Sequence, residues 1–579
     1  MMNRRILSIL LAGVLASGNM MAQGMWIPSK AKTENFDEMK EFGLQLSPDQ
    51  LYSTENGSLK DAIIRLKGGM CSAEFISSQG LVLTNHHCGY DGVASLSSIE
   101  HDYLTNGFWA YSKEQELSIP DYFVSLLVRI EDVTDQVLGS DRDEKNPQVI
   151  QERLQGIITK ASEGGKYKVD PKPMFAGNEY FIYVYEDYKD VRLVGAPPSS
   201  IGKYGGDTDN WMWPRHTGDF TMLRVYAKAD GSASEGYDKA NVPFKPKQYL
   251  PVSMKGVGEG DYAMIMGYPG STDRYLTSDQ IQFAMDYSNG SKIDAMGKRL
   301  EIMKKYMDKN DTIRIAVASS YASGMNGWKY YIGQNTMLKR YDIPGKKRQE
   351  EKDFTKWAVA KGDTTYTKVV SKIGGLYSKD YAEIDRFINY VFYGLMPAAS
   401  LNLGRDFARM KTSMEKDPTS KDVAKKGVEN IKKRLPEWQK EYFPAMDKDI
   451  VTALLIAVKK EVKGDLLPPV INEILASKAA KKGKTDEEKF RMWVNNAFAT
   501  SVVTNKAVRE KFFAMPDVKV LQNDPIVTLA NGVVAHFRDK LAPRFYGVQG
   551  LSEELAKDYI AGLRLANPGK NFYPDANST

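Results

Sequence analysis

Leu81-Val82-Leu83-Thr84-Asn85-His86-His87-Cys88 is the stretch that decides the fold of this chain. Its first four residues are apolar or β-branched, which is typical of a strand, and its polar end carries two histidines and a cysteine. Ala73-Glu74-Phe75-Ile76-Ser77 precedes it, across the polar residues Ser78-Gln79-Gly80. This order predicts a strand, a tight turn and a second strand, because glycine adopts turn conformations that other residues resist. The second strand then delivers a histidine onto a turn.

The cysteine beside that histidine is placed to hold the turn still. The chain has two cysteines, Cys71 and Cys88, and an even number in an exported chain favours a disulfide over free thiols. Closing a loop of this length stabilises the fold by about 3 kcal/mol. A general base must be held within reach of the hydroxyl that it deprotonates, and such a tether would do that. The alternatives are a structural pair of histidines and two thiols that do not pair.

Residues from about 60 to 275 have the composition of a β-domain. They are rich in Gly, Pro, aromatic and β-branched residues in short runs, which suggests a barrel or a sandwich. A helical patch near 144–162 interrupts the pattern. Further strands are predicted at Phe181–Tyr185, Val191–Val194, Thr221–Tyr226 and Tyr262–Met266, the last followed by a turn at Gly267–Gly270.

Residues 276–566 have the composition of a helical domain. Lys, Glu, Ala, Met and Leu dominate, and apolar residues recur at intervals of three and four, as at Ile384, Phe387, Ile388 and Val391. The pair Pro468-Pro469 should break or start a helix. After the helical run, residues 567–579 return to a pattern of extended chain. A length of 579 residues also requires two or more domains.

A second motif, residues 205–220, is dense in Trp, Gly, Asp and His. A catalytic histidine needs a carboxylate to hold its productive tautomer and to stabilise the imidazolium. From the residues alone, Asp207, Asp209 and Asp219 are all candidates for this carboxylate. His216 is expected to make a local hydrogen bond.

These two motifs together resemble the bacterial dipeptidyl-peptidases, chymotrypsin-like serine exopeptidases with an inserted helical domain (the dipeptidyl-peptidase 7/11 type). The resemblance implies a multidomain fold, a chymotrypsin-like double β-barrel with a large α-helical domain inserted in the second barrel. The predicted domains are a signal peptide at 1–22, the first part of the catalytic domain at 23–275, the helical domain at 276–566 and the start of the returning catalytic domain at 567–579.

The resemblance also implies the roles of individual residues. His87 would be the general base and Asp219 would orient it. Asn210 and Trp211 would hold the free N-terminus of the substrate. Asn326, in the stretch Ser323–Lys329, would contact the same amino end, and a helix boundary without function is the alternative for that stretch.

The N-terminus and the net charge bound the location and the partners. Asn3-Arg4-Arg5 precedes an apolar run from Ile6 to Ala16 and small residues to Ala22, which is typical of a secretory signal peptide. No cysteine lies directly after that run, and no later stretch is apolar enough to span a bilayer, so we expect a periplasmic or cell-surface protein without a membrane anchor. A formal charge of +6 over a mixed surface argues against nucleic acid as a partner.

The expected reaction is release of dipeptides from the N-terminus of peptides by acyl transfer, without cofactor or metal. The partners are peptides with a free N-terminus, and a homodimer is an open possibility. The chain has no Gly-x-Ser-x-Gly, and neither Ser72 nor Ser271 lies in a glycine-lined turn. We therefore expect the catalytic serine to lie beyond Thr579 and the 579-residue chain to be inactive.

Two other classes of protein remain open. One is a secreted peptide-binding protein that uses the same cleft without catalysis. The other is a metal-dependent hydrolase that uses His86 or His87 with nearby aspartates. Adjacent histidines on extended chain point to opposite sides, which disfavours a shared metal ion.

Overall fold

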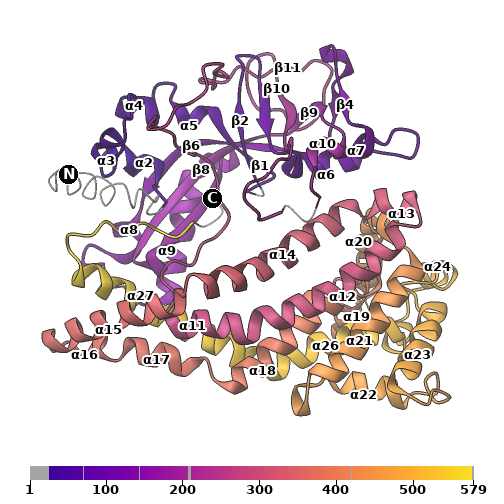
Figure 1. Ribbon diagram of the computed structural model, residues 1–579. Coiled ribbons are helices and arrows are strands. Elements are labelled where there is room, and N and C mark those ends of the chain that lie inside the picture. The colour runs from indigo at the N-terminus through magenta and orange to yellow at the C-terminus, as the bar shows by residue number, and fades with distance from the viewer. Residues whose placement is uncertain (1–24, 70, 143, 207–209, 419, 577–579) are drawn as a thin grey trace, which may run out of the picture.

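The computed structural model describes residues 25–69, 71–142, 144–206, 210–418 and 420–576. The predicted signal peptide therefore lies outside the described residues, as do Asp207 and Asp209. A β module lies above a larger helical module, and helix α14 (Ala318–Arg340) runs between them (Figure 1).

The β module is built on one antiparallel sheet of 11 strands. Its strand order is β4-β9-β10-β3-β2-β1-β6-β8-β7, with β11 paired to β10 and β5 paired to β9. The strands are β1 (Ile63–Leu66), β2 (Cys71–Phe75), β3 (Leu81–Thr84), β4 (Phe108–Trp109), β5 (Leu117–Ser118), β6 (Val124–Asp132), β7 (Lys168–Met174), β8 (Glu179–Tyr188), β9 (Asp190–Ala196), β10 (Thr221–Ala227) and β11 (Val242–Pro243).

The β module also contains helices. They are α2 (Pro28–Ala31), α3 (Phe36–Glu41), α4 (Pro48–Leu51), α5 (Leu59–Ala62), α6 (His86–Leu96), α7 (Tyr103–Asn106), α8 (Thr134–Leu138), α9 (Pro147–Ala161) and α10 (Ser199–Gly202). Helix α9 confirms the helical patch that the sequence predicts near 144–162.

The predicted hairpin at the deciding stretch is confirmed. Strands β2 and β3 pair antiparallel, with Phe75 opposite Val82 and both side chains fully buried. Gly80 takes a φ of +65° in the turn, and a Cβ there would lie 2.7 Å from the carbonyl oxygen of Val225. The turn therefore requires glycine for its backbone conformation and for its close contact with β10.

The sequence suggests extended chain for the two histidines, but the structure differs. They are the first two residues of helix α6, directly after Asn85. This helix contains Gly89 and Gly92, which lower its intrinsic propensity. Tertiary contact overrides that propensity, because a Cβ on Gly89 would lie 2.7 Å from Thr221 and a Cβ on Gly92 would lie 3.1 Å from Ile119. The glycines let the helix lie close against the sheet.

The helical module confirms the predicted periodicity. Its helices are α11 (Ser278–Phe283), α12 (Asn289–Met307), α13 (Asp311–Ala316), α14 (Ala318–Arg340), α15 (Ile343–Lys361), α16 (Thr364–Thr367), α17 (Val369–Leu376), α18 (Lys379–Ile388), α19 (Ala399–Lys416), α20 (Lys421–Glu441), α21 (Pro444–Glu461), α22 (Pro469–Ala476), α23 (Asp486–Thr500), α24 (Lys506–Ala514), α25 (Val518–Gln522), α26 (Pro525–His536) and α27 (Ala542–Ala566). The double proline starts α22, as expected. One large hydrophobic cluster joins α12, α19, α21, α23 and α26.

Helices α13 and α14 contact the β module beside α6 and α7. Arg314 donates a hydrogen bond to Asp102 at 2.8 Å, and Ser319 donates one to Asp91. Ala318 belongs to the hydrophobic cluster of the sheet itself. The first turn of α14 is therefore anchored on the β module.

Helix α27 makes the second contact between the modules. Arg564 forms an ion pair with Glu179 at 2.8 Å, and Asn178 donates a hydrogen bond to the carbonyl of Lys557 at 2.9 Å. Among the described residues, no helix combines the length and hydrophobicity that a membrane crossing needs.

The predicted strand at 262–266 is wrong. Within the described part of the chain, residues 244–277 form no paired strand, and the side chain of Ile265 is fully exposed. No strand lies beside this alternating segment to bond with it, so the segment stays irregular.

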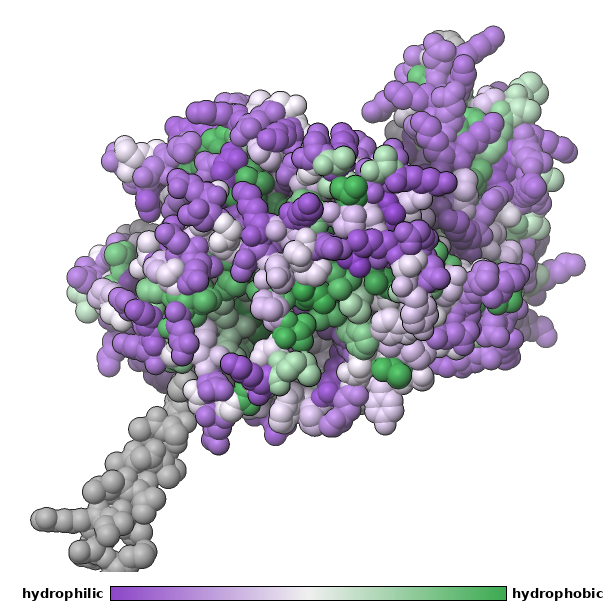
Figure 2. All heavy atoms as spheres, turned by 90° about the horizontal axis from the view of Figure 1, so that it is seen from above, coloured by the Kyte–Doolittle hydropathy of each residue, from purple (hydrophilic) through white to green (hydrophobic). Residues whose placement is uncertain are grey.

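The β-module face seen from above exposes hydrophobic side chains in its middle, surrounded by hydrophilic ones (Figure 2).

The segment after α27 lies beside the stretch of chain that leads into α11. Asp575 accepts hydrogen bonds from Thr272 at 2.8 Å and from the backbone N–H of Arg274 at 2.6 Å. Tyr275 donates one to the carbonyl of Tyr573 at 2.5 Å. Residues 272–275 and 573–576 thus lie side by side, although the whole helical module separates them in sequence.

Candidate active site

His87 and Asp219 lie in direct contact, as the resemblance implies. His87 Nδ1 is 2.8 Å from Asp219 Oδ2, and the backbone N–H of His87 donates to Oδ1 at 3.0 Å. The carboxylate is only 11% exposed, whereas the imidazole is 58% exposed. A carboxylate that grips both the ring and the backbone fixes the position of the ring and leaves its other nitrogen accessible.

Asp219 is held as a carboxylate by its surroundings. Burial alone would raise its pKa, but the hydrogen bonds from His87 and the charge of Arg215 outweigh burial and lower the pKa. Arg215 Nη2 lies 3.5 Å from Asp219 Oδ2, and Asn85 donates to the backbone carbonyl of Asp219 at 3.2 Å. The ionised form is the one that can hold the Nδ1–H tautomer of the histidine.

The expected disulfide between Cys71 and Cys88 is present. Cys71 is the first residue of β2 and Cys88 the third residue of α6, with their Cα atoms 5.9 Å apart. The bond therefore ties the start of the histidine helix to the sheet. It also means that neither sulfur is a thiolate, so the one group of metal-binding residue types found among the described residues, Cys71, His87 and Cys88, lacks two of its ligands.

The three residues expected at the substrate's N-terminus also come together. Asn210 Nδ2 donates to Asn326 Oδ1 at 3.0 Å, and Trp211 Nε1 donates to the carbonyl of Asn326 at 3.1 Å. Asn326 lies in the middle of α14, so the alternative of a helix boundary there is wrong. The Trp211 ring is 5.4 Å from the ring of Tyr330.

The chain between α10 and β10, described at 203–206 and 210–219, links these two groups of residues. It begins after α10, carries Asn210 and Trp211 to helix α14, and returns to the sheet with Asp219 just before β10. Trp211 has a positive φ of 60°, and the Trp213–Pro214 peptide bond is cis. One loop thus supplies the carboxylate for the histidine and two side chains for the contact with the helical module.

Sequence reasoning missed three residues around this site. Asn85 and Arg215 contact Asp219, and Tyr330 packs on Trp211. Asn85 and Arg215 lie inside the two sequence motifs, and this location could have marked them as candidates. Tyr330 lies one helical turn after Asn326 on α14, a spacing that places both on one face.

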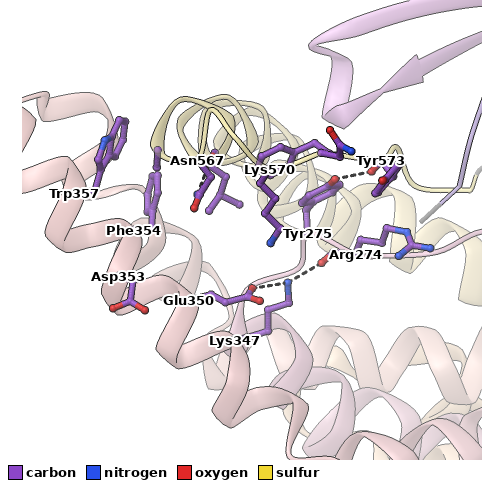
Figure 3. A pocket seen from close by; sticks show the side chains of 14 residues that line it. Arg274, Tyr275, Lys347, Glu350, Asp353, Phe354, Trp357, Asn567, Lys570 and Tyr573 are labelled. Atoms are coloured by element: carbon purple, nitrogen blue, oxygen red, sulfur yellow. Dashed lines mark hydrogen bonds and ion pairs between the residues drawn. The ribbon is translucent and has the colours of Figure 1, made fainter. Parts of the chain in front are cut away.

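A cavity of about 330 Å³ lies elsewhere, between α15, the end of α27 and the returning segment (Figure 3). Its walls include Arg274, Tyr275, Lys347, Phe354, Trp357 and Lys570. Lys347 lines one side of it, donating a hydrogen bond to the carbonyl of Arg274 at 2.8 Å and pairing with Glu350 at 3.1 Å. None of the predicted site residues lines this cavity.

Comparison with known proteins places this chain in a family of peptidases. The chain belongs to the peptidase S46 family, whose model, described as Peptidase S46, matches residues 21–579. Dipeptidyl-peptidase 7 of Porphyromonas endodontalis is 36% identical over 595 residues, covering 100% of this chain and 69% of that protein. The Asp/Glu-specific dipeptidyl-peptidase of Flavobacterium psychrophilum is 35% identical, covering 96% of this chain and 77% of that protein.

Solved structures agree with the family assignment. Porphyromonas endodontalis DPP11 in complex with the dipeptide Arg-Glu superposes with a TM-score of 0.85 at 32% identity, covering 96% of this chain and 79% of that chain. A second crystal structure of Porphyromonas endodontalis DPP11 gives a TM-score of 0.76 at 31% identity, covering 96% of this chain and 79% of that chain. This likeness confirms the predicted fold class, a multidomain fold with a large helical domain. Where the sequence predicts a double β-barrel, the described strands form one open sheet.

Proposed function

We propose that this chain carries the general base, the orienting carboxylate and the N-terminus subsite of a serine-type dipeptidyl-peptidase. The observation that carries the proposal is the double contact of Asp219 with the ring and the backbone of His87. Dipeptidyl-peptidase relatives of this identity and coverage support the choice of reaction.

In this proposal, His87 shuttles a proton during acyl transfer. Asp219 accepts the Nδ1–H, so the other ring nitrogen takes the proton from the attacking serine hydroxyl and later gives it to the leaving amine. Water then releases the acyl dipeptide by the same route. Each step forms and breaks one bond at the second carbonyl of the substrate.

The contact between Asn210, Trp211 and Asn326 supplies the exopeptidase character. Amide oxygens and an indole face are suited to an ammonium group, which donates hydrogen bonds and is attracted to aromatic rings. Since α14 contributes Asn326, the helical module would close the N-terminal end of the groove. A dipeptide-sized space between that end and His87 would then set the product length.

No contact of the base identifies a nucleophile among the described residues. Among the described residues, no serine hydroxyl forms a hydrogen bond with His87. We therefore propose that the 579-residue chain binds N-terminal dipeptides but hydrolyses peptides weakly. Export to the periplasm or cell surface remains part of the proposal, supported by the leader pattern and by the disulfide.

The test uses the purified 579-residue chain and two peptides that differ only in N-terminal acetylation. Calorimetry should show binding of the free peptide and at least tenfold weaker binding of the acetylated one. Mass spectrometry of the mixtures should show little dipeptide release, and His87→Ala should leave binding unchanged. Equal affinity for both peptides would contradict the N-terminus subsite, and rapid release of dipeptides would contradict the missing nucleophile.

Binding without any hydrolysis, also in a longer form of the protein that carries a glycine-flanked serine, would instead favour the peptide-binding alternative. Chelator-sensitive hydrolysis would favour the metal-dependent alternative.

A further inference from the structure

The first histidine of the pair, His86, is buried beside the base. Its side chain is 1% exposed, whereas His87 next to it is exposed. The His86 Nε2 atom is buried and has no hydrogen-bond partner among the described residues. Since this nitrogen is buried without a hydrogen bond, the face of the ring that carries it contributes through its shape.

The His86 ring lies directly on helix α10. A Cβ built on Gly202 would lie 2.3 Å from His86 Cδ2 and 2.7 Å from His86 Nε2. No side chain larger than hydrogen fits there while the ring is in place. Tyr90 packs edge-on against the same ring, with ring centroids 5.8 Å apart.

Helix α10 in turn lies directly on the residue before Asp219. Gly218 donates its backbone N–H to the carbonyl of Ile201 at 3.0 Å, and a Cβ on Gly218 would lie 2.6 Å from Ile201 Cγ2. Any shift of α10 toward or away from α6 would therefore move the backbone that carries the Asp219 carboxylate.

These contacts form a closed ring of neighbours. His86 touches Gly202, the adjacent Ile201 bonds to Gly218, and Asp219 follows Gly218 and returns to His87 through two hydrogen bonds. We propose that His86 is a positioning residue whose buried imidazole sets the spacing between α6 and α10 and thereby places Asp219 against His87. Its relevance to catalysis rests on the proposed function, but the spacing itself does not.

The test follows the hydrogen bond between His87 and Asp219 directly. The chain has five histidines, so ¹⁵N-histidine labelling gives few signals, and His87→Ala assigns the low-field Nδ1–H resonance. Removing the spacer with His86→Ala should broaden this resonance and speed its exchange with solvent at least tenfold. His86→Leu, of similar size and without polar atoms, should retain it.

Helix α10 offers the reciprocal test. Gly202→Ala should weaken the same resonance, because its methyl group meets the imidazole. Gly156→Ala is the matched control, since a Cβ there meets nothing within 4 Å. In the double variant with His86→Ala and Gly202→Ala, the methyl group occupies part of the vacated space, so the loss should be smaller than the sum of the single losses.

Circular dichroism reports whether each variant folds. A folded His86→Ala protein with an unchanged resonance would overturn the proposal, and so would a leucine variant that loses the resonance or fails to fold. If the alanine variant itself fails to fold, the leucine variant and Gly202→Ala decide. Loss of peptide hydrolysis or binding in every form, with the resonances as expected, would refute the proposed function and leave the positioning role intact.

Discussion

Asn210, in a loop of the β module, donates a hydrogen bond to Asn326 in the middle of helix α14, 116 residues later in the chain, at an Nδ2–Oδ1 distance of 3.0 Å. The indole N–H of Trp211 bonds to the carbonyl of the same residue. Two side chains from one module thus converge on one residue of the other. In the proposed function, this is where the substrate's amino group is read and where the two modules are joined.

Replacing these asparagines should weaken peptide binding and reveal their coupling. We expect Asn210→Ala and Asn326→Ala each to raise the Kd for dipeptides about tenfold, because each removes a partner and leaves a polar atom unpaired. The loss of binding free energy in the double variant should be about 1 kcal/mol smaller than the sum of the two single losses, because a hydrogen-bonded pair is coupled by about this amount. Calorimetry with free dipeptides measures all three.

Asn472→Ala is the control for this set, since Asn472 is exposed on α22 and bonds only to Lys459 among the described residues. Strictly additive losses would show that the two asparagines act independently, which would contradict a shared subsite.

The disulfide should stabilise the module that carries the base. Cys71 and Cys88 are 17 residues apart, and opening a loop of this size costs about 3 kcal/mol of stability in the chain-entropy model. Urea unfolding of the Cys71→Ser, Cys88→Ser double variant, followed by circular dichroism, measures the loss. Since the sequence has no other cysteine, reductant should not change the unfolding curve of the double variant. It should shift the unfolding curve of the wild type toward that of the double variant. Coincident unfolding curves would contradict a stabilising role.

Asp219→Asn should remove catalysis while leaving the fold in place. An amide cannot hold the base in its productive tautomer, so kcat should fall by about 10⁴ with KM little changed, in any form of the protein whose hydrolysis is measurable. Asp135→Asn is the control, because Asp135 forms an exposed pair with Arg142. A fall of less than tenfold would mean that this carboxylate does not orient the base.

The same variant has a defined effect on stability. The pKa of Asp219 is lowered in the folded protein, so its stabilisation is fully present above the unfolded pKa of about 3.9 and is lost as the pH falls through the folded pKa. The difference in unfolding free energy between wild type and Asp219→Asn should therefore shrink at acid pH and be constant at neutral pH.

Local sequence patterns predict the hairpin, the helical patch near 144–162 and the helical character of residues 276–566, because these features follow from hydrophobic periodicity and a single turn glycine. The alternating run at 262–266 failed for the complementary reason. Its pattern is that of a strand, but a strand also needs a neighbour, and the described residues provide none.

The site was predicted less completely from the residues themselves. They left Asp207, Asp209 and Asp219 open, and only the family resemblance selected Asp219. In the structure, the backbone hydrogen bond from Gly218 to Ile201 helps to place Asp219. This contact joins two backbone segments, and no local sequence pattern encodes it. The start of helix α6 is misjudged as extended chain for the same reason. Gly89 and Gly92 lower the helix propensity of this segment, and their close approach to Thr221 and Ile119 is visible only in the folded structure.

A buried aspartate in the helical module should give the protein a second pH dependence. Asp447 on α21 is 2% exposed, and it accepts hydrogen bonds from the backbone N–H groups of Ala399 and Ser400 at 2.8 and 2.9 Å, at the start of α19. Burial outweighs these bonds and raises its pKa to about 6. The folded state therefore holds a proton more tightly than the unfolded state, whose pKa is about 3.9.

It follows that the contribution of Asp447 to stability falls as the pH rises from about 4 to 6 and stays low above that. A difference of about two pKa units corresponds to roughly 3 kcal/mol. The unfolding free energy of the wild type minus that of Asp447→Asn should decrease by this order between pH 4 and pH 7, because asparagine does not titrate. Urea unfolding at a series of pH values gives the difference directly, free of the other titrating groups that both proteins share. Asp449→Asn, two residues along the same helix and 33% exposed, reports any effect of removing a charge from this helix that is not due to burial. A difference that rises with pH would mean that the hydrogen bonds to α19 outweigh burial and that Asp447 is a stabilising helix cap in its charged form.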